Sequence, residues 1–158
     1  AWTLSLLSIP MSDFGRGAPV QPPLDLAGEK VAVNICYEDV FGEELIAAAR
    51  DATLLVNVSN TAWFGDSLAQ PQHLQIAQLR ALEMGRPMLR ATNTGMTAAI
   101  GADGRIIAAL PPFERAGLRV ELSGQQGLTP FMRWGNAPVV IGALLLIGAA
   151  MVRRKASR

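Results

Sequence analysis

The sequence predicts an α/β domain with a mixed β-sheet, followed by one transmembrane helix near its C-terminus. Short β-branched runs alternate with amphipathic helical runs from residue 30 to residue 92, which is typical of parallel strands joined by helices. An Asp-Gly pair at residues 103–104 separates two further apolar runs and predicts an antiparallel hairpin, which makes the sheet mixed. A long uncharged apolar run near the end predicts the membrane helix.

Size and composition limit the number of domains and the kinds of function. The chain has 158 residues, enough for one domain with a core plus an appendage. We predict a domain over residues 1–130, and a transmembrane helix with a basic tail over residues 131–158. A net charge of +1 with 17% charged residues argues against electrostatic binding of nucleic acid. One Cys and one His cannot form a disulfide or fill a zinc site, and we expect neither a metal nor a cofactor.

The first elements lead to the only cysteine. Residues 1–28 are rich in Pro, Gly and Ser without a regular period, so we expect an irregular surface segment that ends in a turn. The strand that follows, residues 30–35, is apolar enough to be buried on both faces. It delivers Cys36 to the point where the pattern becomes acidic and then helical, over residues 40–50. Acidic residues in the first turn of that helix complement its dipole.

A second strand and a longer helix complete the predicted βαβ unit. Residues 53–58 form a buried apolar run, and residues 59–66 make a loop at its end, where α/β proteins commonly place binding groups. The helix over residues 70–85 has Pro71 in its first turn and Gly85 as its stop. Its apolar positions near helical spacing are Leu74, Ala77, Ala81, Leu82 and Met84.

The remaining strands follow this helix. Residues 87–92 predict a third strand of the unit, and residues 97–100 and 105–110 predict the two arms of the hairpin. Residues 117–122 alternate between apolar and polar side chains, which predicts a final strand near an edge of the sheet.

The predicted membrane helix is defined by its flanks as much as by its apolar run. Residues 137–152 contain no charged or strongly polar group. Arg133 and Trp134 provide an interfacial anchor before it, and the basic residues after it are Arg153, Arg154, Lys155 and Arg158. By the positive-inside rule the tail is cytoplasmic, and the domain faces the periplasm in a bacterium. The alternative is a buried core helix at the end of the chain.

Cys36 is the main candidate for chemistry, although a small buried hydrophobe is the simpler interpretation. A strand-to-helix corner can expose a thiol beside a helix N-terminus, which favours the thiolate. Glu38 and Asp39 follow directly, and a buried strand rarely ends in two carboxylates unless they have hydrogen-bond partners or serve a site. The only histidine, His73, could pair with Cys36 in principle, but its place in the longer helix favours a satisfied structural residue.

Four segments together resemble the bacterial apolipoprotein N-acyltransferases, which are membrane-embedded members of the nitrilase superfamily. These segments are NICYEDVFGE at residues 34–43, NVSNTAWFGD at residues 57–66, QHLQIAQLRALEMGRPMLRATNTGMTAAIGADGRI at residues 72–106, and LTPFMRWGN at residues 128–136. The strand–Cys–Tyr–Glu corner alone would indicate only the nitrilase group. The aromatic loop, the long helical run and the terminal helix make the resemblance specific.

The resemblance implies a fold, a reaction and roles for five residues. The fold is the C-terminal part of a nitrilase-like α-β-β-α layered domain with one terminal membrane helix. Cys36 matches the nucleophile that takes a fatty acyl group from a glycerophospholipid as a thioester. It then passes that group to the N-terminal amine of a diacylglyceryl-cysteine lipoprotein. Tyr37 and Glu38 match supporting positions beside the nucleophile; we assign Glu38 to ordering the pocket by hydrogen bonding, with structural support as the alternative. Trp63 and Phe64 match an aromatic loop that would line the acyl pocket, with packing over the sheet edge as the alternative.

The chain also departs from the pattern of that family. The family uses a Cys–Glu–Lys triad whose Glu and Lys precede the nucleophile, and Glu29 and Lys30 do not match those positions. Thr61 stands where the family pattern leads us to expect an acidic residue. We therefore interpret the chain as a fragment that is inactive alone, from an enzyme of the bacterial inner membrane. The alternatives are a membrane-anchored nitrilase-like amidase with water as acceptor, and a non-catalytic truncated membrane-anchored module.

Overall fold

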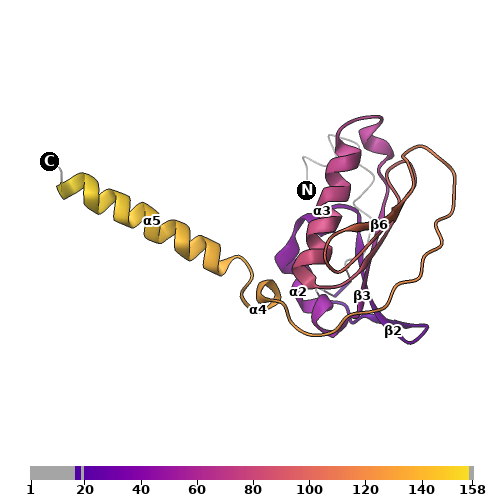
Figure 1. Ribbon diagram of the computed structural model, residues 1–158, viewed down its shortest axis with the longest axis horizontal. Helices are drawn as coiled ribbons and strands as arrows, with labels where there is room; N and C mark the ends of the chain where they lie inside the picture. Colours follow the sequence, from indigo (N-terminus) through magenta and orange to yellow (C-terminus); the bar gives the residue numbers. More distant parts are fainter. Residues whose placement is uncertain (1–16, 19, 157–158) are drawn as a thin grey trace.

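The computed structural model describes residues 17–18 and 20–156, which form a layered α/β domain and a projecting helix (Figure 1). The strands are β1 (Leu24–Leu26), β2 (Glu29–Ile35), β3 (Leu54–Ser59), β4 (Met88–Thr92), β5 (Ala98–Ile100) and β6 (Ile106–Ala109). The helices are η1 (Cys36–Val40), α2 (Gly42–Asp51), η2 (Ala62–Phe64), α3 (Ala69–Met84), α4 (Pro130–Trp134) and α5 (Ala137–Ala156), of which η1 and η2 are 3₁₀ helices.

The six described strands form one sheet in the order β1-β2-β3-β4-β5-β6. The pairs β2–β3 and β3–β4 are parallel, and the other three pairs are antiparallel, so the predicted mixed sheet is confirmed. Helices α2 and α3 follow β2 and β3 and serve as the crossover connections that parallel strands require. This topology brings the carboxyl ends of β2, β3 and β4 to one edge.

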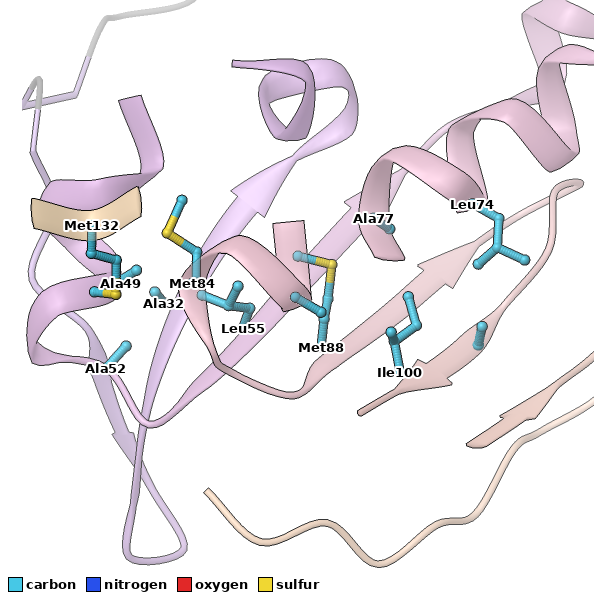
Figure 2. Close-up of a cluster of buried hydrophobic side chains, with 12 residues drawn as sticks. Ala32, Ala49, Ala52, Leu55, Leu74, Ala77, Met84, Met88, Ile100 and Met132 are labelled. Carbon is cyan, nitrogen blue, oxygen red and sulfur yellow. The ribbon is translucent and has the colours of Figure 1, made fainter. Parts of the chain in front are cut away.

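The hydrophobic core lies between the sheet and helices α2 and α3 (Figure 2). Leu55 and Met88 project from the central strands toward Ala49 of α2 and toward Ala77 and Met84 of α3. The small side chains of Ala49 and Ala77 let the helices approach the strands closely. Neither these residues nor Met84 have any exposed surface. Leu45 and Ile46 of α2 pack against this core.

The other face of β2 is open toward the carboxyl end of the strand, although Val31 near its amino end is 4% exposed, and this corrects the expectation that the whole first strand is buried on both faces. Along β2, Ala32 is buried, whereas Val33 is 45% exposed and Ile35 is 61% exposed. The pattern continues on β3, where Val58 is 39% exposed. Because successive side chains of a strand alternate between faces, a layer of helices on one side buries only every second residue.

Two segments differ from their predicted structure. Residues 24–26, within the predicted irregular segment, form β1, because Ala27 and Gly28 both have positive φ angles (52° and 85°) and close a tight hairpin onto β2. The rest of that prediction falls partly on residues 1–16 and 19, which lie outside the described residues. Residues 117–122 form no strand. They alternate between half-buried and exposed side chains as predicted, but their backbone makes no ladder with a neighbouring strand.

Helix α3 agrees with its prediction except at one residue. Its last residue is followed by Gly85 in the left-handed conformation (φ 58°, ψ 36°), a common helix ending. Leu82, however, is 52% exposed. It follows the buried Ala81 directly and is therefore turned by about 100° away from the core.

Helix α5 projects away from the domain (Figure 1) and is joined to it by the short helix α4. Residues 137–154 are long and apolar enough to cross a membrane, with a mean hydropathy of 1.7, and none of this stretch is buried. The alternative of a buried core helix is therefore wrong. At the junction Met132 of α4 enters the core, and the Asn136 amide donates to Glu43 Oε1 at 2.8 Å, which ties the start of α5 to α2.

Candidate active site

Cys36 lies at the carboxyl edge of the sheet, as the first residue of η1 after β2. Its φ angle is 56°, in the left-handed region that costs a non-glycine residue about 1–3 kcal/mol. The residue is partly exposed and its thiol is free. Glu38 Oε2 accepts a hydrogen bond from the Ile35 amide at 2.6 Å and so pins the end of β2. We call residues 35–39 the Cys36 corner; it presents a thiol in a strained conformation that the fold must stabilise.

A buried asparagine on the neighbouring strand holds this corner from behind. Asn57 of β3 has no exposed surface. Its Nδ2 donates to the Cys36 carbonyl oxygen at 2.9 Å and also to Asn34 Oδ1. Its Oδ1 accepts from Ser59 Oγ at 2.7 Å and from Arg90 Nη1 at 2.8 Å. Asn57 therefore joins the backbone of the nucleophile candidate to the next strand.

A buried ionic cluster lies beside the asparagine. Arg90 Nη1 of β4 is 3.3 Å from Asp39 Oδ2, and Asp39 Oδ1 is 2.9 Å from His73 Nε2 of α3. Asp39 has no exposed surface, Arg90 is 2% exposed and His73 is 7% exposed. Burial lowers the pKa of Arg90, and its electrostatic interactions with Asp39 and with the Cys36 side chain oppose this decrease. The guanidinium stays protonated because its ordinary pKa lies above 12. A fixed cation thus lies within electrostatic reach of the Cys36 thiol.

The loop after β3 is tied down at the same edge. Gln70 Nε2 of α3 donates to the carbonyl oxygens of Thr61 (3.2 Å) and Gly65 (3.1 Å). From the end of β4, Asn93 Oδ1 accepts from the Thr61 amide at 3.0 Å. Thr61, which replaces the acidic residue expected from the resemblance, is fully buried, and its hydroxyl is 3.3 Å from that of Thr94. The loop is therefore held at both ends.

The structure places the predicted site residues on two short helices, η1 after β2 and η2 after β3. Cys36, Tyr37 and Glu38 share η1; the Tyr37 side chain is exposed, and its ring makes an edge contact with Phe41 at 5.9 Å between centroids. Trp63 and Phe64 lie on η2 and are 84% and 49% exposed, so Trp63 does not pack over the sheet edge.

Two further observations bear on the site. A cavity of about 260 Å³ runs along β2 beside the Cys36 corner, and Trp63 and Phe64 do not line it. Its lining includes Leu24, Val33, Ile35, Glu38 and Leu45. His73 has Asp39 as its partner, in agreement with the prediction of a satisfied structural residue. Within the described part of the chain no group of His, Cys, Asp and Glu residues could hold a metal ion.

Sequence reasoning missed three polar residues that sit on one level of the sheet. Asn34 is paired with Asn57, and Asn57 with Arg90, across β2, β3 and β4. We call these residues the polar rung. The available signal was a single polar residue near the end of each of three apolar runs. It acquires meaning only when the register places the three side by side.

Comparisons with known proteins agree with this architecture. A family model described as carbon-nitrogen hydrolase matches residues 6–125. The apolipoprotein N-acyltransferase of Nitrosomonas europaea is 59% identical over 150 residues, covering 94% of this chain and 30% of that relative. The one from Ralstonia nicotianae is 54% identical over 158 residues, covering 98% and 30%. The chain thus spans about 30% of the length of these curated relatives.

Among solved structures, the carbon-nitrogen hydrolase from Helicobacter pylori G27 matches with a TM-score of 0.56 at 18% identity. The match covers 65% of this chain and 43% of that one, and it supports the fold alone.

Proposed function

The chain belongs to the carbon-nitrogen hydrolase family, and from this premise we propose that it is the C-terminal part of an apolipoprotein N-acyltransferase with Cys36 as its nucleophile. The relatives that carry this name are 46–59% identical to nearly the whole chain. The single observation that carries the proposal is the conformation of Cys36. A left-handed φ angle at a non-glycine residue is costly and such strain clusters at active sites; of the three non-glycine residues with this conformation in the described chain, Ala27, Cys36 and Phe113, Cys36 is the one with a nucleophilic side chain.

The proposed reaction has two steps. The Cys36 thiolate attacks an ester carbonyl of a glycerophospholipid, the ester C–O bond breaks, and the lysophospholipid leaves as an alcohol after taking up a proton. The α-amine of a diacylglyceryl-cysteine then attacks the thioester, the C–S bond breaks, and an amide forms while the thiol takes up the proton that the amine releases. The general base and the lysine that the resemblance implies are not assigned to residues of this chain.

Several features of the chain suit lipid substrates. Helix α5 is apolar along residues 137–152, and Arg153 and Arg154 follow this run. Trp134, the last residue of α4 before α5, is 61% exposed. In our proposal α5 spans the bacterial inner membrane with its basic end in the cytoplasm and the domain in the periplasm. Trp63 and Phe64 would contact the acyl chain, and Tyr37 would border the site. A reporter fused after Arg158 should be cytoplasmic, and a periplasmic reporter would contradict this topology.

Mass spectrometry of the full-length enzyme tests the mechanism. Incubation with phosphatidylethanolamine should add one acyl group to Cys36, and a diacylglyceryl-cysteine peptide should then remove it. The matched control is Cys36→Ala, which should remain unmodified. Active enzyme whose Cys36 is never acylated would overturn the mechanism. Release of free fatty acid or cleavage of an amide, without transfer to the peptide, would instead indicate the hydrolytic alternative.

A further inference from the structure

The hydrogen bonds around the Cys36 corner form a closed circuit. From the Cys36 carbonyl the circuit runs to Asn57, from Asn57 to Arg90, and from Arg90 to Asp39, which is three residues after Cys36 in the same helix η1. The circuit therefore begins and ends on the strained turn, and two neighbouring strands supply its other members.

Each member of the circuit fixes the orientation of the next. The two acceptor contacts of Asn57 Oδ1, from Ser59 and Arg90, turn its amide so that Nδ2 faces the Cys36 carbonyl. The position of Arg90 is fixed in turn by Asp39. His73 holds the second oxygen of that carboxylate. Because all of these side chains are buried, water does not compete for their contacts and the geometry has little freedom.

We propose that Asn57 and Arg90 are positioning residues for Cys36. Asn57 fixes the carbonyl group of Cys36 by a hydrogen bond. Arg90 orients Asn57 and also contacts Asp39, which belongs to the same turn as Cys36. This inference rests on the proposed nucleophilic role of Cys36. A reacting atom must lie within a few tenths of an ångström of its productive position, and a displacement of about 1 Å can cost about 100-fold in rate. The electrostatic reach between Arg90 and Cys36 agrees with the same arrangement.

Two variants of the full-length enzyme test the circuit. Asn57→Asp keeps the shape and the acceptor for Arg90 but loses the donor to the Cys36 carbonyl. Arg90→Lys keeps the charge, but a lysine ammonium does not reproduce the position of Nη1, the single nitrogen from which Arg90 contacts both Asn57 and Asp39. Each should lower kcat for thioester formation about 100-fold with KM unchanged. Each should also slow alkylation of Cys36 by iodoacetamide, followed on the Cys36 peptide by mass spectrometry.

The matched control is Arg86→Lys. Arg86 is as buried as Arg90, at 2% exposed, and lies four residues away, but it contacts only backbone carbonyls at the opposite end of β4. It should lower the midpoint of thermal unfolding while leaving kcat and the alkylation rate unchanged. If Arg86→Lys and Arg90→Lys reduce kcat equally for an equal loss of thermal midpoint, Arg90 is merely structural and the inference fails.

The readouts separate this inference from the proposed function. If Arg90→Lys does not fold, Asn57→Asp decides the question, because wild-type kcat and wild-type alkylation in that variant would each overturn the positioning role of Asn57. If phospholipid never acylates wild-type Cys36 but alkylation still slows in Asn57→Asp, the positioning inference stands and the proposed function fails.

Discussion

Two buried arginines belong to β4, one just before the strand and one in its middle, and they have different kinds of partner. Arg86, before the strand, donates to the backbone carbonyls of Ala52 at 2.7 Å and Gly127 at 2.8 Å. Arg90, within the strand, donates to the side chains of Asn57 and Asp39. Both are 2% exposed. Backbone acceptors join chain segments, whereas side-chain acceptors specify the positions of individual groups. The two arginines therefore distinguish the two ends of the parallel strands. At the amino end of the sheet, contacts to the backbone fasten chain segments together. At the carboxyl end, contacts between side chains position the groups of the candidate site.

The amino end of the sheet has a second set of contacts that fasten chain segments together. The carboxylate of Glu29, at the start of β2, accepts hydrogen bonds from the Thr53 hydroxyl and the Gly124 amide. These bonds hold the pKa of Glu29 below its usual value. Together with the bond from the Gln125 amide to the Thr53 carbonyl, they fasten the irregular segment after β6 to the sheet.

The largest expected effect is a loss of activity, and it comes from a substitution at the carboxyl end of the sheet. Cys36→Ala should abolish acyl transfer, because no other thiol exists in this chain to carry the acyl group. Removing one sulfur atom from a partly exposed residue should leave the midpoint of thermal unfolding nearly unchanged. Activity of the full-length variant and its melting curve check the two halves of this prediction. Retained transfer would return Cys36 to a packing role and remove the distinction between the two ends.

A smaller loss of activity is expected from substitutions of Glu38, which also lies at the carboxyl end of the sheet. Glu38→Ala removes the acceptor for the Ile35 amide and should lower the rate of thioester formation about tenfold, which corresponds to about 1.4 kcal/mol. Glu38→Gln keeps an acceptor oxygen and should lose less. Single-turnover acylation of Cys36 measures both variants. Equal rates in the two would show that the carboxyl charge, rather than the hydrogen bond, is what the corner requires.

At the amino end the expected loss is in stability. Arg86→Met leaves the buried carbonyl of Ala52 without this donor, at a cost of about 1–3 kcal/mol, and also removes the bond to the carbonyl of the exposed Gly127. The thermal midpoint should fall, whereas the alkylation rate of Cys36 at a temperature well below the transition should not change. A slower alkylation in the folded variant would mean that the two ends of β4 are coupled.

The smallest effect concerns pH. Because the folded-state pKa of Glu29 is lowered, its contribution to stability is present above the unfolded pKa and is lost as the pH falls through the folded value. Thermal unfolding followed from neutral pH to below about 4.5, the ordinary pKa of a glutamate, should therefore show a loss of stability that Glu29→Gln reduces. A pH profile that is identical in Glu29→Gln would exclude this residue as a contributor.

The sequence predicted elements whose signals are local. The Gly85 stop, the first-turn Pro71 and the Asp-Gly hairpin depend on the backbone preferences of a few residues, and each lies where it was expected. Residues 117–122 have the alternation of a strand but no partner, because pairing depends on a neighbour that local pattern does not identify.

The site was predictable in part for the same reason. Cys36 and Glu38 are adjacent in sequence and could be connected before the fold was known. The polar rung depends on the register of three strands, so Asn34, Asn57 and Arg90 looked like isolated polar residues in apolar runs. The exposure of Val33 and Ile35 was unpredictable too, because an apolar strand does not reveal which of its faces the helices cover.

The bond between the Asn136 amide and Glu43 Oε1, the bond from Arg50 Nη2 to the Met132 carbonyl and the core position of Met132 together hold the start of α5 against α2. Glu43 lies in the first turn of α2, only seven residues after Cys36. Few residues therefore separate the thiol from the point where α5 is attached. With α5 in a bilayer, the height of Cys36 above the lipid would then be set by this junction between α5 and the domain rather than by a flexible linker. A lipid substrate would meet the thiol through lateral diffusion in two dimensions, at a high effective concentration fixed by that height.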